Sequence, residues 1–220
     1  MVSRLSSTLP ILILISLSTA SLTAAENLQV TCGSTIKLQH TITKFRLHSH
    51  QVAYSRGSQQ QSVTGFPEGD DGNSLWVVQG PENEPCTPGH AVAKHQKLRL
   101  QHVTTRRWLH SHRFQSPLSS NQEVSAFGSD TETDGGDVWT VEWDSKYKSW
   151  KQDQKIRLKH LDTGFYMHSQ DAKFGAPIAG QDEVCCIERK DRYAEWQAAE
   201  GVYFPSPETI ARRLAAGDEL

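Results

Sequence analysis

The sequence lacks the short motifs that mark the common catalytic and nucleotide-binding sites. Its 220 residues contain no Gly-x-Ser-x-Gly elbow, no His-Glu-x-x-His pair and no P-loop, so enzymes of those types are not indicated. The formal net charge of −2 also lacks the positive excess that nucleic-acid-binding proteins carry. We therefore expect that the chain is not an enzyme and has no catalytic residues, no cofactor and no nucleic-acid partner.

Long apolar runs are absent after the N-terminal segment. The run Leu9–Leu17 follows Arg4 and precedes small residues that end at Ala25. This pattern is typical of a cleaved secretory signal peptide, which we place at residues 1–25. The run is too short to cross a bilayer comfortably, so an uncleaved anchor is the weaker alternative. We expect no membrane span.

The other end of the chain carries a second targeting pattern. Its last four residues, Gly217, Asp218, Glu219 and Leu220, resemble the KDEL and HDEL retrieval signals, although glycine departs from the first letter of both. Together with the signal peptide, this tail indicates the lumen of the endoplasmic reticulum. Secretion is expected instead if the GDEL signal is weak.

Cysteine is scarce, and no Cys-x-x-Cys redox motif occurs. The four cysteines are Cys32, Cys86, Cys185 and Cys186. They would enter an oxidising compartment, where three complete pairings are possible. A bond between the adjacent Cys185 and Cys186 would be strained. We favour the pair Cys32–Cys86 and leave the pairing of the other two open.

The chain contains three copies of one pattern. The first copy opens IKLQHTITKFRLHSH at Ile36, the second LRLQHVTTRRWLHSH at Leu98 and the third IRLKHLDTGFYMHSQ at Ile156. Each copy continues through QSVTG, QEVSAFG or DEVCCIE to a tryptophan: Trp76, Trp139 and Trp196. We place the three repeats at residues 28–82, 90–145 and 148–203, followed by a tail at 204–220.

Each copy reads as β-strands rather than helices. Apolar and polar residues alternate from Ile36 to His40, and the same alternation recurs in the other copies, which is the two-residue period of a strand. One copy cannot bury its apolar face alone, whereas three related by threefold pseudosymmetry can close a barrel. We therefore predict an all-β fold, a β-trefoil of one domain. Ser206, Pro207 and Glu208 predict a short helix in the tail.

The repeated LxLxH, LHSH and tryptophan elements resemble the MIR repeat of protein O-mannosyltransferases and of inositol trisphosphate and ryanodine receptors. The segments VTCGSTIKLQH, FRLHSH and SPLSSNQEVSAFG resemble the stromal cell-derived factor 2 family more closely still, and this resemblance covers roughly residues 28–204. This resemblance implies a quality-control adaptor linked to the unfolded protein response. Its partners would be a lumenal J-domain cochaperone, Hsp70 and misfolded or glycosylated clients. The alternative is a carbohydrate-binding module that recognises O-mannosylated or other glycosylated clients.

Eight of the ten histidines occupy repeated positions, which indicates a structural demand. We expect buried hydrogen bonds at His48, His110 and His168 and at the serines that follow them, Ser49, Ser111 and Ser169. A metal site is not expected, because acidic and cysteine ligands are missing from their sequence neighbourhood. The pairs Asp70–Asp71 and Asp182–Glu183 read as solvated turn residues. For the carbohydrate alternative, Trp108 and Tyr166 are the candidate stacking shelf.

Overall fold

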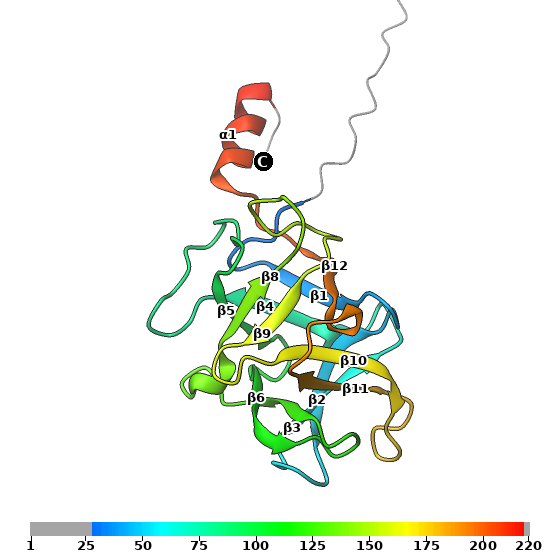
Figure 1. Ribbon diagram of the computed structural model, residues 1–220. Helices are drawn as coiled ribbons and strands as arrows, with labels where there is room; N and C mark the ends of the chain where they lie inside the picture. Colours follow the sequence, from blue (N-terminus) through cyan, green and yellow to red (C-terminus); the bar gives the residue numbers. More distant parts are fainter. Residues whose placement is uncertain (1–27, 218–220) are drawn as a thin grey trace, which may run out of the picture.

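The computed structural model describes residues 28–217, and the predicted signal peptide and Asp218, Glu219 and Leu220 lie outside this range. The fold is all-β with one short C-terminal helix, as predicted (Figure 1). The strands are β1 (Thr35–His40), β2 (Arg46–Ala53), β3 (Gln61–Phe66), β4 (Leu75–Gln79), β5 (Lys97–His102), β6 (Trp108–Gln115), β7 (Gln122–Phe127), β8 (Trp139–Glu142), β9 (Arg157–His160), β10 (Tyr166–Lys173), β11 (Asp182–Ile187) and β12 (Trp196–Val202). Three 3-10 turns, η1 (Gly72–Ser74), η2 (Gly135–Asp137) and η3 (Arg192–Ala194), precede β4, β8 and β12, and α1 spans Pro207–Ala216.

The twelve strands form one barrel-like sheet with two kinds of pairing. Six strands pair in the order β12–β1–β4–β5–β8–β9, and a bridge between Ile156 and Trp196 joins the two ends of this series. The other six form the hairpins β2–β3, β6–β7 and β10–β11, which contact one another through β3, β7 and β11. The same four-strand pattern thus occurs three times, as unit 1 (β1–β4), unit 2 (β5–β8) and unit 3 (β9–β12).

The hairpins also repeat in register. The pairs His48–Thr64, His110–Ser125 and His168–Cys185 lie opposite one another, and each first strand shifts register just after its serine. The turn before each hairpin needs a positive φ, which Lys44 (66°), Arg106 (60°) and Gly164 (74°) adopt. Only glycine reaches this region without a steric cost. The positive φ of Lys44 and Arg106 must therefore be maintained by the hydrogen bonds around these turns.

The core is built from matching positions of the three units. The predicted tryptophans Trp76, Trp139 and Trp196 each stand at or next to the start of the last strand of a unit and are fully buried. They pack with the alternating strand residues and with one valine from each hairpin: Val63, Val124 and Val184. A single unit of four short strands could not form a core of this size, so the three units depend on one another for it.

The predicted Cys32–Cys86 disulfide is present. It ties the segment before β1 to the loop before β5. Cys185 and Cys186 on β11 are both free and fully buried, so the vicinal bond does not form.

Helix α1 begins as the sequence predicts. The Ser206 hydroxyl accepts a hydrogen bond from the Thr209 backbone N–H at 3.2 Å, Pro207 is the first helical residue, and Gly217 ends the helix with φ 80°. None of its residues is buried, and the helix stands apart from the sheet (Figure 1). Among residues 28–217, no helix has the length and hydropathy of a membrane span.

Candidate functional site

The predicted histidines lie beside aspartates of their own units. Nδ1 of His48 is 2.7 Å from Oδ2 of Asp71, and Nε2 of His110 is 3.1 Å from Oδ1 of Asp134. In unit 3, His168 Nε2 lies 3.7 Å from Asp191 Oδ1. Each aspartate directly precedes a 3-10 turn. Each pair therefore joins the second strand of a unit to the turn before its last strand.

The neighbouring residues of the motif make equivalent bonds in the three units. Ser49, Ser111 and Ser169 donate their hydroxyl hydrogens to the carbonyl oxygens of Ser62, Glu123 and Glu183 at 2.7, 2.7 and 2.8 Å. The indole N–H groups of Trp76, Trp139 and Trp196 donate to the carbonyls of Leu47, Leu109 and Met167 at 2.9, 2.9 and 3.1 Å. The repeated letters therefore correspond to a repeated hydrogen-bonded layer.

Burial lowers the pKa of two histidines in this layer, His110 and His168. It lowers the pKa of His110 to about 4 despite the Asp134 carboxylate nearby. It also lowers the pKa of His168. In Asp71, burial is outweighed by hydrogen bonds from Ser74 and His48, and the pKa of the carboxyl group falls. At neutral pH His110 is thus a neutral imidazole beside a carboxylate.

Two expectations about acidic residues are wrong. Acidic groups do lie next to the histidines, because the barrel brings Asp71, Asp134 and Asp191 to them across 23 or 24 residues of sequence. Asp182 and Glu183 are not solvated turn residues either, since both are fully buried in β11. Asp182 pairs with Lys173 Nζ at 2.6 Å, and Glu183 accepts a hydrogen bond from the Ser119 backbone N–H at 2.9 Å.

The second histidine of the motif differs between units. His50 Nδ1 lies 3.2 Å from His48 Nε2, whereas His112 Nε2 lies 3.0 Å from Oε1 of the fully buried Glu123. Unit 3 has the exposed Gln170 at this position. The first histidine therefore lies beside an aspartate in all three units, and the second position has no such common partner.

A polar cavity of about 410 Å³ opens where unit 2 meets unit 3. It is lined by Gln60, His110, Ser111, His112, Arg113, Asp134, Gly135, Gly136, His160, Asp162 and Thr163. Turn η2 has two glycines where η3 has Arg192 and Tyr193, and Tyr193 packs against His168 with ring centroids 5.8 Å apart. A Cβ on Gly136 would lie 2.3 Å from His110 Nε2, so a side chain is excluded at this position and the cavity stays open.

The predicted stacking shelf is not formed. Trp108 is only 4% exposed, the Arg99 guanidinium lies 4.0 Å from its ring centroid, and its indole N–H donates to Ser129 O at 2.8 Å. A sugar therefore has no free face of Trp108 to stack on. Tyr166 is partly buried, with Lys159 Nζ 5.6 Å from its ring.

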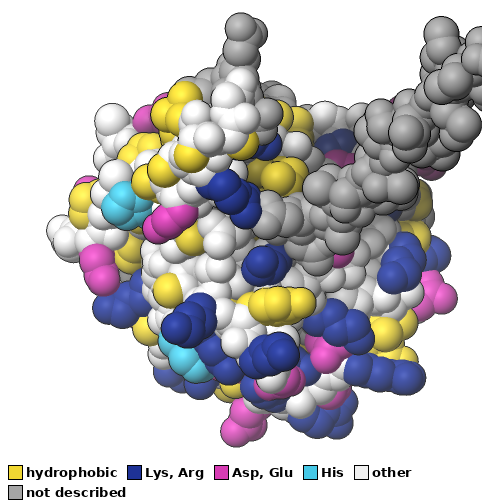
Figure 2. All heavy atoms as spheres, turned by 90° about the horizontal axis from the view of Figure 1, so that it is seen from above, with side chains coloured by type: hydrophobic (Ala, Val, Ile, Leu, Met, Phe, Trp, Pro, Cys, Tyr) yellow, Lys and Arg dark blue, Asp and Glu magenta, His cyan; other side chains and the backbone are white. Residues whose placement is uncertain are grey.

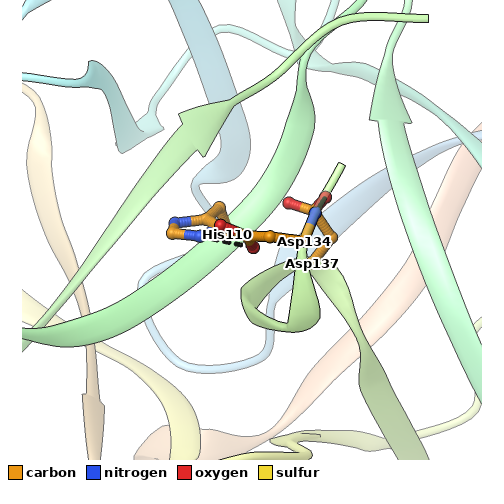
Figure 3. Close-up of side chains that lie close together, drawn as sticks. All are labelled: His110, Asp134 and Asp137. Carbon is orange, nitrogen blue, oxygen red and sulfur yellow. Dashed lines mark hydrogen bonds and ion pairs between the residues drawn. The ribbon is translucent and has the colours of Figure 1, made fainter. Parts of the chain in front are cut away.

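One cluster in this region has the composition of a metal site. Within residues 28–217, His110, Asp134 and Asp137 form the group of three whose potential ligand atoms all lie within 4.8 Å of one another. Figure 3 shows the imidazole on its strand facing Asp134, which precedes turn η2, and Asp137, which ends it. Asp137 is fully buried, and burial raises its pKa to about 7.

The aspartates could have been found in the sequence from their spacing. Asp71, Asp134 and Asp191 each stand five residues before the repeated tryptophan of their unit, since 76 − 71, 139 − 134 and 196 − 191 all equal five. Glu123 and Glu183 give no such threefold signal, because Ser62 occupies the corresponding position in unit 1.

Comparison with known proteins agrees with this architecture. The MIR domain model matches residues 45–146. The stromal cell-derived factor 2-like protein of Arabidopsis thaliana is 50% identical over 192 residues, which cover 87% of this chain and 88% of that protein.

Solved structures show the same likeness. The crystal structure of the SDF2-like protein from Arabidopsis thaliana aligns with a TM-score of 0.80 and 51% identity over 81% of this chain and 99% of that one. The S. cerevisiae protein O-mannosyltransferase Pmt1-Pmt2 complex bound to the sugar donor aligns with a TM-score of 0.74 and 31% identity, over 83% of this chain and 27% of that one. The chain therefore belongs to the stromal cell-derived factor 2-like family of MIR-domain proteins.

Proposed function

We propose that this protein is a non-enzymatic quality-control adaptor of the endoplasmic reticulum lumen. It would act with a lumenal J-domain cochaperone and Hsp70 on misfolding clients. The observation that carries the proposal is the 50% identity to a family member over 88% of that protein's length, which leaves little of the relative outside the aligned region. A shared partner surface would therefore lie within the aligned part of both chains.

The disulfide supports the lumenal location. Cys32 and Cys86 are joined across 54 residues, and such bonds persist in oxidising compartments but rarely in the cytosol. The predicted signal peptide and the GDEL tail are consistent with this location.

The repeated pairings support a finer description of the fold. We propose that units 1, 2 and 3 are three MIR repeats and that together they form a β-trefoil, with six strands in the barrel and three hairpins across one end. A rigid barrel of this kind would present loops and edges to a partner without changing its own shape.

An adaptor needs a surface on which a partner can bury apolar area. The segments that meet at the α1 end carry four exposed apolar side chains: Leu28, Val202, Phe204 and Leu214. Beside them, a cavity of about 490 Å³ is lined by residues that include Lys151, Arg212 and Arg213. Figure 2 looks onto this end and shows scattered hydrophobic side chains among Lys and Arg side chains and some Asp and Glu side chains. We therefore place the partner surface here.

The test is crosslinking in intact cells with an internal tag that leaves GDEL free, followed by mass spectrometry. Stoichiometric capture of a J-domain protein with Hsp70 supports the proposal. The double variant Val202→Asp/Leu214→Asp should lose this capture, because it places two charges in the apolar surface. Phe114→Asp is the matched control, since Phe114 is 56% exposed on hairpin β6–β7 in the half of the molecule away from α1 (Figure 1).

A carbohydrate-binding module is the second candidate. It is favoured by the alignment with an O-mannosyltransferase complex whose structure contains the sugar donor. Because Trp108 is covered, the polar cavity beside η2 would supply the hydrogen bonds instead of an aromatic shelf. Binding to immobilised mannosides that free mannose competes away, and that Asp162→Ala abolishes, would establish this function. Capture of the J-domain protein and Hsp70 unaffected by mannose would exclude it as the basis of that complex.

A further inference from the structure

Asp137 is a fully buried acid with one oxygen that has no hydrogen-bond partner. Its Oδ2 accepts hydrogen bonds from the Thr133 hydroxyl at 2.5 Å and the Asp134 backbone N–H at 3.1 Å. Its Oδ1 is buried and has no hydrogen-bond partner. The Arg99 guanidinium donates from Nη1 to Thr133 Oγ1 at 2.9 Å and attracts the Asp137 carboxylate through its charge, without filling Oδ1. Burying an acid oxygen without a hydrogen-bond partner costs free energy of folding, unless a cation coordinates that oxygen.

The scaffold itself does not require this acid. Turns η1, η2 and η3 precede the same strand in each unit, and their last residues are Ser74, Asp137 and Ala194. Two of the three units therefore build the turn with a small neutral side chain. Asp137 closes the capping box of η2 through Oδ2, which accepts from the Asp134 backbone N–H, but this role leaves Oδ1 without a partner.

The hydrogen bonds of His110 point to the same place. The Ser125 hydroxyl donates to Oε1 of Gln60 at 2.6 Å, so its oxygen is left to accept from His110 Nδ1, 3.4 Å away. A neutral imidazole with its proton on Nδ1 turns the lone pair of Nε2 toward Asp134 Oδ1 at 3.1 Å. In this tautomer Nε2 and Oδ1 can ligate a cation together, whereas with the proton on Nε2 the same two atoms form a hydrogen bond that the cation would replace.

We propose that His110, Asp134 and Asp137 bind a divalent transition-metal ion, with Zn²⁺ as the representative. One imidazole nitrogen and two carboxylates are a normal ligand set for Zn²⁺, and a fourth position is filled by water. Zn²⁺ holds such ligands at about 2.0–2.2 Å, which separates neighbouring ligand atoms by roughly 3.3 Å, close to the His110–Asp134 spacing. The polar cavity lined by His110 and Asp134 supplies the path for ion and water.

The equivalent residues of unit 3 provide an internal control. His168 and Asp191 are placed like His110 and Asp134, but Ala194 replaces the third ligand, and His168 Nδ1 has no hydrogen-bond partner. The ring of His168 is therefore free to carry its proton on Nε2, which faces Asp191 Oδ1 at 3.7 Å. The proposed site belongs to unit 2 alone, and it is independent of the adaptor function.

The experiment is a calorimetric titration of Zn²⁺ into the tag-free mature chain after EDTA treatment and dialysis. We expect one equivalent of Zn²⁺ bound in the wild type. Asp137→Asn and Asp134→Asn should each weaken binding at least tenfold, and Asp191→Asn should leave it unchanged.

A second measurement requires no variant. In long-range ¹H–¹⁵N spectra of the wild type, Zn²⁺ should shift the Nε2 signal of His110 and leave that of His168 in place. The proposal is overturned by the absence of saturable binding up to 1 mM free Zn²⁺, by binding that Asp137→Asn does not weaken, or by an unchanged His110 signal at saturation.

Discussion

Glu123 of unit 2 accepts a hydrogen bond from the backbone N–H of Ser58, 3.1 Å away in the hairpin loop of unit 1, and also from the Ser58 hydroxyl. Its carboxylate is fully buried, and it also contacts His112 Nε2 at 3.0 Å. One side chain therefore holds a loop from a different unit. Glu183 repeats the arrangement one unit further on, where it accepts from Ser116 and Ser119.

Replacing this carboxylate should destabilise the protein strongly. In Glu123→Ala, the Ser58 N–H and hydroxyl lose a buried acceptor, and each unsatisfied polar group costs about 1–3 kcal/mol. We expect the free energy of unfolding to fall by about 2–4 kcal/mol in urea titrations. Glu132→Ala, at an exposed position, is the control and should change stability by less than about 0.5 kcal/mol. An unchanged midpoint for Glu123→Ala would contradict the role given to this residue.

The His48–Asp71 pair gives a second stability prediction. His48→Ala removes a buried partner of Asp71 and the ring that stacks on Phe66 with centroids 4.8 Å apart. We expect a loss of about 2–3 kcal/mol. His95→Ala is the matched histidine control, because its side chain is 63% exposed. Equal denaturation midpoints for the two variants would show that His48 is not a structural residue.

The titration of Asp137 predicts a pH effect with a definite sign. Burial raises the pKa of Asp137 in the folded protein to about 7, from 3.8 in the unfolded chain. Between these values only the folded state holds the proton, so this group favours folding at low pH, and its contribution declines as the pH rises from about 4 to about 7. The Asn side chain does not titrate, so the stability of Asp137→Asn lacks this decline.

The measurement is the difference in the free energy of unfolding between wild type and Asp137→Asn, in EDTA, from pH 4.5 to 8. We expect the wild type to lose stability relative to the variant with rising pH, by up to about 1.4 kcal/mol per pH unit, and the difference to level off above pH 7. A difference that is constant over this range would show that Asp137 has an ordinary pKa.

The disulfide should contribute substantially to stability. It closes a loop with a sequence separation of 54 residues, and loops of this size correspond to about 2–4 kcal/mol of stabilisation. The double variant Cys32→Ser/Cys86→Ser should therefore unfold at a lower temperature by calorimetry, and a reducing agent should lower the melting temperature of the wild type alone. Cys185→Ser is an unsuitable control because Cys185 is fully buried, so the reduced and oxidised wild type are compared directly.

The sequence predicts those parts of the structure that repeat or alternate. The period of two from Ile36 to His40, the threefold tryptophans and the Ser206–Pro207 cap all specify local structure, and the strands and helix lie where expected. Trp108 shows the limit. Alternation assigns it to a strand face, but only the packed barrel brings Arg99 of β5 across its ring.

Contacts between residues that are far apart in the sequence are equally hard to predict from the sequence. Glu123 lies 65 residues from Ser58, and nothing in its local sequence distinguishes it from a solvated acid. Asp71 lies 23 residues from His48, and only its repeated spacing before a tryptophan, not its local sequence, marks it. The turn glycines are a further case. Gly136 reads as an ordinary loop residue, yet its lack of a side chain keeps the η2 cavity open against His110.

The pairing of β1 with β12 has a consequence for biosynthesis. The first strand to leave the ribosome is paired with the last, with His40 opposite Trp196 and Ile36 opposite Gly201. Until residues 196–202 are translated, one edge of β1 has unpaired backbone groups and adjoining apolar side chains, a state prone to aggregation. The nascent chain therefore keeps this edge of β1 open through almost its whole synthesis, and it folds only if the edge stays out of contact with other chains until β12 has been made.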